Sequence, residues 1–311
     1  MSGIVGIAGG FGAGDDCVQP FMLERTGIRG RLLRLGPLID TIVTRPDYPR
    51  PVAHLLAELV ALGTVLSSTL KYDGIFTLQT KGDGAVRTMV MDVTSAGDVR
   101  GYVGFDHEAV AARADAAPPY EVADWLGQGH VAFTVDQGPH TDRYQGLVEL
   151  VGPRLTDSLL HYFRQSQQVN AGILVAARQG ADGWRASALL IERIPESAGG
   201  ETSAIADEDW RRSLILMASC TEDELLDPVL SPETLLFRLF HEEGVRVFPP
   251  RPLRVGCRCT RERLEGILLT LTPEDLESMT LEDGGLVMTC EFCAKDFRFD
   301  AAGLEQISAR R

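Results

Sequence analysis

The chain has 311 residues, 44% hydrophobic and 24% charged, and its 30 basic and 44 acidic residues give a formal net charge of −14. This composition fits a globular protein of about two domains, and the acidic balance argues against nucleic acid as a partner, because duplex-binding proteins present a basic face to phosphates. The N-terminus lacks the basic region of a signal peptide, and no apolar run approaches the roughly 18 residues of a membrane span, so we expect a cytoplasmic protein without a membrane partner.

The first region, residues 1–195, is expected to form an α+β domain. Residues 1–14 (MSGIVGIAGGFGAG) are interpreted as a disordered leader, because no Lys-Ser/Thr pair follows the glycines as it would in a phosphate loop. Apolar residues recur at helical spacing from Val52 to Leu70 and predict a core-facing helix.

Runs typical of antiparallel strands follow that helix. Glycine-containing turns separate 74–80, 85–93 and 99–105 as a meander, 130–137 and 143–151 as a hairpin, and 171–178 and 184–194 as a last pair, with a helical pattern over 155–168. Runs of strands with few helices predict an antiparallel-sheet domain of the α+β class and not a doubly wound sheet.

The second region, residues 196–254, is expected to be an acidic helical linker. Thirteen acidic residues stand against four arginines between Glu192 and Glu243. Short apolar stripes indicate short helices, which we expect Pro228 and Pro232 to separate. The stripes comprise Trp210, Leu214, Leu216 and Met217, then Leu225, Leu226 and Leu230, then Leu235, Leu236, Leu239 and Phe240. Such helices bury little surface each, so the linker should be marginally stable and depend on its neighbours; a merely solvated linker is the simpler alternative.

The third region, residues 255–311, holds four cysteines in two tight pairs, Cys257-x-Cys259 and Cys290-x-x-Cys293. A unit this small rarely has enough core to fold alone, and in a reducing compartment clustered cysteines indicate a metal or redox site. Four thiolates match one tetrahedral Zn²⁺ per reduced chain, and they leave no open position for catalysis. No histidine has a metal-binding spacing.

The same thiolates allow two interpretations. Zinc can be structural only, holding the small domain folded. Alternatively, peroxide converts a thiolate to a sulfenic acid, which condenses with a nearby cysteine. The shortest loops predict the disulfides Cys257–Cys259 and Cys290–Cys293, whose formation would release zinc and unfold the small domain. The isolated Cys17 and Cys220 are interpreted as small buried hydrophobes, and a redox part is left open for Cys220 because it lies in the linker.

Several segments together resemble a known family. They are CRCTRERLEGIL, EDGGLVMTCEFC, LLFRLFHEEGVRVF, GDGAVRTMVMD, VDQG followed by YQGLVELVG, and YFRQSQQ. They resemble the bacterial redox-regulated holdase chaperones, the thirty-three-kilodalton heat-shock protein family, from about Asp15 to the C-terminus. The resemblance implies a cytosolic oxidative-stress chaperone that is inactive when reduced and zinc-bound, is activated by oxidation, and holds unfolding proteins without ATP. It also implies that Cys257, Cys259, Cys290 and Cys293 are both the zinc ligands and the redox switch, that the N-terminal domain forms an exchanged homodimer, and that a metastable linker unfolds on activation.

The leading hypothesis is therefore a redox-gated holdase that is not an enzyme. Its expected client-binding residues are Trp210, Leu214, Leu235 and Leu239, which would leave their packing sites when the linker opens. The alternative is a constitutive zinc-ribbon interaction module that binds nucleic acid or a protein partner. An enzyme ranks third, because the sequence shows no set of nucleophile, base and orienting residue.

Overall fold

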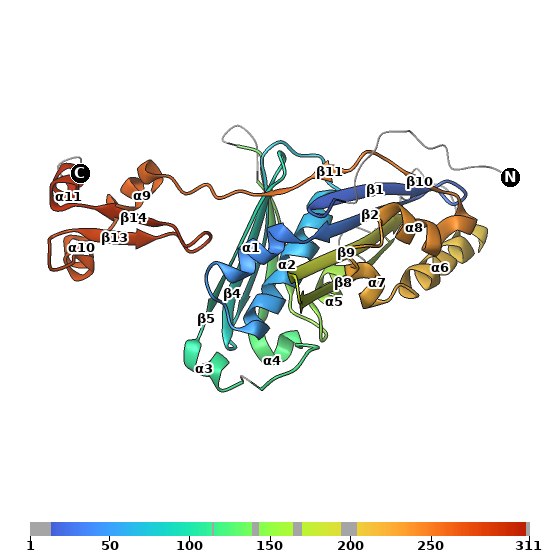
Figure 1. Ribbon diagram of the computed structural model, residues 1–311, viewed down its shortest axis with the longest axis horizontal. Coiled ribbons are helices and arrows are strands. Elements are labelled where there is room, and N and C mark those ends of the chain that lie inside the picture. Colours follow the sequence, from blue (N-terminus) through green and yellow to red (C-terminus); the bar gives the residue numbers. More distant parts are fainter. Residues whose placement is uncertain (1–13, 114, 139–142, 164–169, 194–203, 309–311) are drawn as a thin grey trace. The chain divides into compact units, whose positions relative to one another are not determined.

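The computed structural model describes residues 14–113, 115–138, 143–163, 170–193 and 204–308. The expected leader lies outside the described residues except for Gly14, and so does the stretch 196–203 that opens the expected linker. The chain divides into two compact units, residues 1–255 and 256–311 (Figure 1). The mixture of antiparallel sheets and helices confirms the predicted α+β class.

Two sheets form the frame of the larger unit. The first has the order β10-β1-β2-β9-β8 with β11 also on β1, and the second has the order β12-β5-β4-β3-β6-β7. The strands of the first sheet are β1 (Cys17–Leu23), β2 (Ile28–Leu35), β8 (Asn170–Gly180), β9 (Gly183–Arg193), β10 (Val245–Val247) and β11 (Arg251–Pro252). Those of the second are β3 (Ile75–Gly82), β4 (Val86–Thr94), β5 (Asp98–Phe105), β6 (Gly129–Asp136), β7 (Tyr144–Glu149) and β12 (Arg254–Val255). The predicted meander, hairpin and last strand pair are all present as antiparallel ladders.

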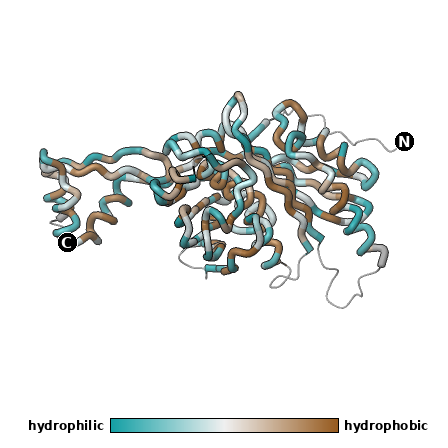
Figure 2. Tube along the Cα trace, turned by 90° about the horizontal axis from the view of Figure 1, so that it is seen from below, coloured by the Kyte–Doolittle hydropathy of each residue, from teal (hydrophilic) through white to brown (hydrophobic). Residues whose placement is uncertain are grey.

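Helix α2 (Arg50–Ser67) is the centre of the larger core. It contacts strands of both sheets, and nearly all of its side chains are buried, as its apolar pattern predicted. Figure 2 shows the hydrophobic residues concentrated along the strands of this unit. By length and hydropathy α2 also meets the test for a membrane span, which the sequence was not expected to contain, but 83% of the tested window is buried inside the fold, as in a core helix.

The other helices of the larger unit are short. Those near the sheets are α1 (Pro37–Thr44), α3 (His107–Ala111), α4 (Val122–Leu126) and α5 (Leu155–Tyr162). The linker contributes α6 (Ala204–Ala218), α7 (Glu222–Leu226), α8 (Pro232–Phe240) and the 3₁₀ turn η2 (His241–Glu243). Pro228 separates α7 from α8 as predicted, but Pro232 is the first residue of α8. A proline fits there because the first N–H of a helix has no intrahelical partner.

The linker helices cover the face of the first sheet that points away from α2. Phe21 of β1 and Leu189 of β9 lie in a second hydrophobic cluster with Leu235 and Phe240 of α8, and the rings of Phe21 and Phe240 stack with centroids 5.7 Å apart. The first sheet is thus buried on both faces. The apolar stripes of the linker are packing surfaces on this sheet.

Two arginines of the first sheet bind the backbone at the end of α7. Arg34 of β2, 3% exposed, donates to the carbonyl oxygens of Asp227 (2.7 Å) and Leu230 and, more weakly, of Glu224 (3.4 Å). Arg185 of β9 donates to the carbonyl oxygen of Leu226 at 2.9 Å. The last carbonyls of a helix lack intrahelical partners and carry its negative dipole end, so both guanidinium groups stabilise the docked linker.

The end of the linker is extended, whereas the sequence was expected to be helical up to residue 254. After Gly244, which has a φ of +69°, residues 245–255 form a segment that we call the strap. Its strands β10 and β11 pair antiparallel with the edge of β1, and β12 pairs parallel with the edge of β5. Prolines at 249, 250 and 252 exclude a helix here, because proline lacks the N–H that a helix requires.

The smaller unit is built around the hairpin β13 (Leu286–Thr289) and β14 (Asp296–Phe299), with helices α9 (Arg261–Leu268), α10 (Pro273–Met279) and α11 (Ala301–Ser308). Its buried hydrophobic residues are few: Leu264, Leu268, Leu286, Phe297, Phe299 and Ile307. A core of this size contributes little net stability, so the unit needs an additional crosslink.

Replacing Arg34 by Met should loosen the linker without unfolding the core, because the carbonyl oxygens at the end of α7 lose their charged donor. Hydrogen bonds to charged groups contribute about 2 kcal/mol each, so amide hydrogen exchange in α7 and α8 should accelerate roughly thirtyfold or more while α2 keeps its protection. Arg29→Met, on the same strand but exposed, is the matched control and should leave exchange unchanged. Equal acceleration in both variants would contradict a specific role for Arg34.

Candidate metal and redox centre

The four clustered cysteines come from two backbone segments of the smaller unit. Cys257 and Cys259 lie between β12 and α9, and Cys290 and Cys293 lie in the turn that joins β13 to β14. In that turn the N–H groups of Cys293 and Ala294 both donate to the carbonyl oxygen of Cys290, at 3.3 and 2.7 Å, and Ala294 has a φ of +54°. This tight knuckle brings the sulfurs of Cys290 and Cys293 close together.

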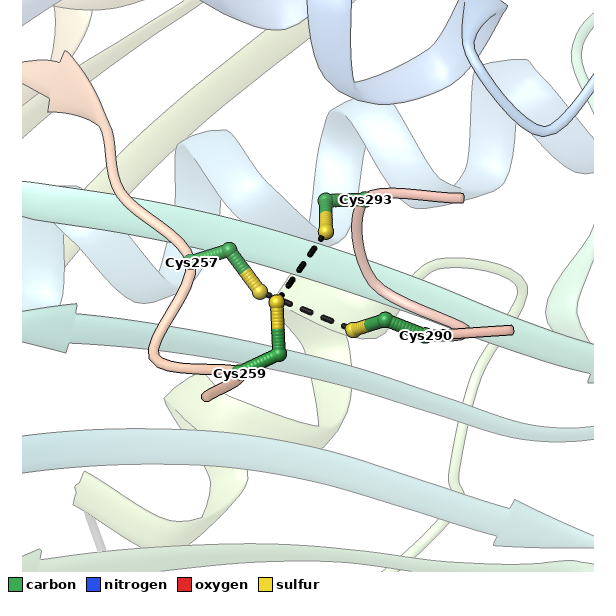
Figure 3. Close-up of side chains that lie close together, drawn as sticks. All are labelled: Cys257, Cys259, Cys290 and Cys293. Atoms are coloured by element: carbon green, nitrogen blue, oxygen red, sulfur yellow. Dashed lines mark hydrogen bonds between the residues drawn. The ribbon is translucent and has the colours of Figure 1, made fainter. Parts of the chain in front are cut away.

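The four sulfur atoms form one compact group (Figure 3). All lie within 4.8 Å of one another, and the distances are 3.6 Å between Cys257 and Cys290 and 3.4 Å between Cys259 and Cys293. A tetrahedral zinc with sulfur ligands at about 2.3 Å has sulfur–sulfur separations of about 3.8 Å. The donor set therefore fits a closed Zn²⁺ site, and it is the sole group of three or more potential metal ligands in the described part of the chain.

The cysteines are also part of the small core. Cys259 and Cys290 are half-buried and pack against the hydrophobic residues of this unit. Thr260, next to Cys259, caps α9 by accepting a hydrogen bond from the N–H of Arg263 at 3.3 Å. A bond between the two cysteine segments would therefore hold α9 and the hairpin together.

The environment of the thiols favours a thiolate at one position. Burial would raise the pKa of Cys257, but hydrogen bonds from the backbone N–H of Cys259 and from the three other thiols outweigh it and lower that pKa to about 7. Burial and the neighbouring thiols raise the pKa of Cys259. A cluster in which one thiolate is favoured near neutral pH is chemically suited both to metal binding and to oxidation.

The two isolated cysteines differ from the cluster. Burial raises the pKa of Cys17 and of Cys220 to about 11, and nearby acidic groups add to the effect. Thiols with such pKa values are poor nucleophiles at neutral pH. Cys220 packs against the second hydrophobic cluster, which fits its interpretation as a small hydrophobe and gives no support to a redox part.

The expected client-binding residues all lie in the second hydrophobic cluster. Trp210 and Leu214 of α6 are half-buried, and Leu235 and Leu239 of α8 are buried. While the linker is docked, Leu235 and Leu239 are covered by their neighbours and Trp210 and Leu214 are covered in part. Their assignment as a client surface therefore stays a prediction that depends on linker opening.

The polar contacts that attach the linker could not be predicted from the sequence. Besides Arg34 and Arg185, Arg212 of α6 binds both carboxylate oxygens of Glu243, at 2.6 and 3.1 Å, and Glu243 is buried. This bidentate pair joins α6 to Glu243, two residues before the strap begins at Val245. The pattern offered no signal for it, since the two residues are 31 positions apart and each sits in a run of other charges.

Comparison with known proteins connects this architecture to one family. A family model described as Hsp33 protein matches residues 16–300. A curated 33 kDa chaperonin of Caulobacter vibrioides is 39% identical over 301 residues, covering 96% of this chain and 99% of the relative. One of Pseudomonas fluorescens is 36% identical over 295 residues and covers 94% of each. The crystal structure of a 33 kDa chaperonin, a heat shock protein 33 homologue of Thermotoga maritima, superposes with a TM-score of 0.75 at 21% identity, covering 94% of this chain and 97% of that one, which shows a shared fold.

Reduced protein should bind about one zinc per chain through four sulfur ligands, and Cys290→Ser should weaken that binding because one ligand of a closed site is lost. Elemental analysis after removal of free metal measures the first, and amide exchange should show lost protection in residues 256–308 with α2 unchanged. Cys220→Ser is the matched control and should keep its zinc. Carefully reduced protein without bound metal would contradict the assignment.

Proposed function

The chain belongs to the Hsp33 protein family, and from this premise we propose that it is a redox-regulated, ATP-independent holdase chaperone of the cytoplasm. The observation that carries the proposal is the place of the cysteine cluster. The four thiols occupy the position of a crosslink in a unit with a very small core, and that unit follows directly on the strap that ends the linker. A chemical change at the sulfurs can thereby reach the linker.

In the reduced protein Cys257, Cys259, Cys290 and Cys293 would hold Zn²⁺, which when bound supplies a tetrahedral crosslink between the two cysteine segments. Zinc binding in comparable small domains is worth about 10 kcal/mol. That free energy exceeds what a core of this size can supply, so loss of the thiolates should unfold the small unit.

Peroxide is the proposed oxidant. A thiolate of the cluster attacks one peroxide oxygen, the O–O bond breaks, and a sulfenic acid forms with release of hydroxide, which takes up a proton. The second thiolate of the same segment then attacks the sulfenic sulfur; the S–S bond forms and the oxygen leaves as water after protonation. Each disulfide takes two electrons from two thiols and consumes one peroxide, so Cys257–Cys259 and Cys290–Cys293 together consume two.

The linker is the proposed response element. Its helices are short, pack on the sheet with one face each, and belong to a stretch with about nine uncompensated negative charges, counted from Glu192 to Glu243. Segments with such limited packing open at lower free energy than a core. We propose that unfolding of the small unit lets the linker open, so that Trp210, Leu214, Leu235 and Leu239 and the sheet face beneath them bind unfolding proteins, with a homodimer formed on activation.

The alternative, a constitutive zinc-ribbon module, has less support from the chain itself. Residues 256–311 contain eleven acidic and seven basic residues, so this unit lacks the excess of positive charge with which nucleic-acid-binding modules approach phosphates. A protein partner for such a module stays open to experiment.

The central experiment compares reduced and peroxide-treated protein as suppressors of the aggregation of a chemically unfolded client, without ATP. We expect strong suppression after oxidation, little in the reduced form, and reversal when a thiol reductant and zinc are restored. The double variant Cys17→Ser with Cys220→Ser should be gated like the parent protein, because both thiols lie outside the cluster. Equal suppression in both redox states would show that redox gating is wrong.

Oxidation should produce the disulfides Cys257–Cys259 and Cys290–Cys293, since the loops that they close contain one and two residues whereas any cross-pair closes about thirty. Peptide mapping of the oxidised protein after blocking of free thiols identifies the pairs. Predominant cross-pairs, or Cys220 joined to the cluster, would refute this pairing.

A further inference from the structure

Among the residues that the structure describes, the strap is the segment that covers the outer edge of β1. Backbone groups of a strand point alternately to its two neighbours, and on β1 the groups that point away from β2 bind the strap. In the strap, the N–H of Leu253 donates to the carbonyl oxygen of Asp16 at 2.7 Å, and the N–H of Phe248 donates to the carbonyl oxygen of Pro20 at 2.9 Å. Just before the strap, the carbonyl oxygen of Gly244 accepts from the N–H of Glu24 at 3.0 Å. Removal of the strap would leave a row of unpaired carbonyl and N–H groups along residues 16–24.

The strap is held mainly through its backbone, and its partly buried side chains Val245, Leu253 and Val255 add apolar contacts with the two hydrophobic clusters. Arg246, Val247 and Phe248 are exposed, Val247 by 40% and Phe248 by 37%. The buried side chain of Gln19 donates to the carbonyl oxygen of Phe248. The ion pairs Arg246–Glu24 and Arg254–Asp98 lie at the surface, where such pairs contribute little. Few buried contacts and many surface hydrogen bonds characterise a segment that opens easily.

Each end of the strap adjoins a part of the chain that, under the proposed function, unfolds or opens after oxidation. Val255, the last residue of the strap, lies two positions before Cys257, the first cysteine of the cluster. At the other end Glu243, one residue before Gly244, is paired with Arg212 of α6 in the linker. When the small unit and the linker helices open, the strap keeps only its pairing with the sheet edges, the hydrogen bond from Gln19, its surface ion pairs and the apolar contacts of Leu253 and Val255.

We propose that the β1 edge uncovered in this way is a strand-pairing site for extended segments of unfolding proteins. The inference rests on the proposed function and specifies how clients are recognised: by backbone hydrogen bonds to residues 16–24, in addition to apolar contacts. Added strands bind mainly through their main chain, so one edge can accept many sequences. That tolerance suits a chaperone whose clients share no sequence.

The strap itself shows which segments fit. It reads Val-Arg-Val-Phe over β10 and Phe248, and Arg246 forms an ion pair with Glu24, the residue that follows β1. The edge therefore favours extended client segments rich in β-branched or aromatic residues. Prolines 249, 250 and 252 of the strap limit further strand addition onto the covered sheet, because proline has no N–H to donate to a neighbouring strand.

The test uses a fluorescent peptide of residues 243–255 (EGVRVFPPRPLRV), which comprises the strap and the two residues before it, and the full-length protein in both redox states. The peptide should bind oxidised protein at least about tenfold more tightly than reduced protein, whose edge is covered. N-methylation at Phe248, whose N–H points to β1, should weaken binding about tenfold or more, whereas N-methylation at Val247, whose N–H points away in this register, should change it less than about threefold.

The same peptides are then added to the client aggregation assay with oxidised protein. Excess unmodified peptide and the form methylated at Val247 should restore aggregation, and the form methylated at Phe248 should not. Oxidised protein that suppresses aggregation while no peptide competes, or while both methylated forms act alike, would overturn the edge proposal and leave the proposed function standing. Absence of suppression by oxidised protein would overturn both.

Two further readouts separate other occupants of the edge. If the peptide converts an oxidised dimer to monomers without changing aggregation suppression, the edge holds the strap of a second copy, and the client proposal is wrong. If the amides of Arg246 and Phe248 keep their exchange protection after oxidation, the strap stays in place, which also overturns the proposal. Rapid exchange at both amides together with peptide competition supports it.

Discussion

Four sulfur atoms from two backbone segments meet in one group, and a bond through this group would be the constraint on which the small unit depends. Its hydrophobic core contains only a handful of buried side chains, and two of the cysteines are packed into that core. A larger domain would tolerate the loss of one crosslink, because its buried apolar area would still exceed the conformational entropy of the chain. Here a metal bound by the four sulfurs would be a crosslink within the core itself, so chemistry at the sulfurs would change the folding free energy of the unit.

The linker is attached to the first sheet by different forces along its length, and this gives it a graded stability. The middle is fixed by the stacking of Phe21 on Phe240 and by the guanidinium group of Arg34 among backbone carbonyls. The strap is fixed chiefly by main-chain hydrogen bonds at the surface. Loss of the small unit would therefore act first on the strap, which it adjoins, and reach the helices only afterwards. Such an order would let the degree of oxidation determine how much surface is exposed.

Elements with a regular apolar pattern could be predicted from the sequence, and the structure contains them. The four closely spaced cysteines, expected to form one group, lie together. Apolar residues recur regularly in the helix from Val52 and in the later strand pairs, because the surroundings of each element are the same along its length. Strands β1 and β2 and helix α1 went unpredicted: β1 contains Pro20 and the buried Gln19, and β2 contains three arginines, so neither alternates cleanly. The strap was read as helix because its pairing partners lie more than 150 positions away. The docking role of Arg34 could not be predicted for the same reason, since the carbonyl groups that it binds come near it only in the folded linker.

The arrangement of the four sulfur atoms determines what each possible disulfide pairing would do to the small unit. Sulfur contacts run between the two segments, at 3.6 Å from Cys257 to Cys290 and 3.4 Å from Cys259 to Cys293, as expected where four ligands are arranged around one point. Disulfides along those contacts would keep α9 joined to the hairpin, so the small unit would stay crosslinked after oxidation. Disulfides within each segment would leave the two segments unconnected and would also consume the thiolates that would hold the metal. The short spacings within each pair thus favour the one outcome in which oxidation removes the crosslink, and a switch that unfolds on oxidation requires that outcome.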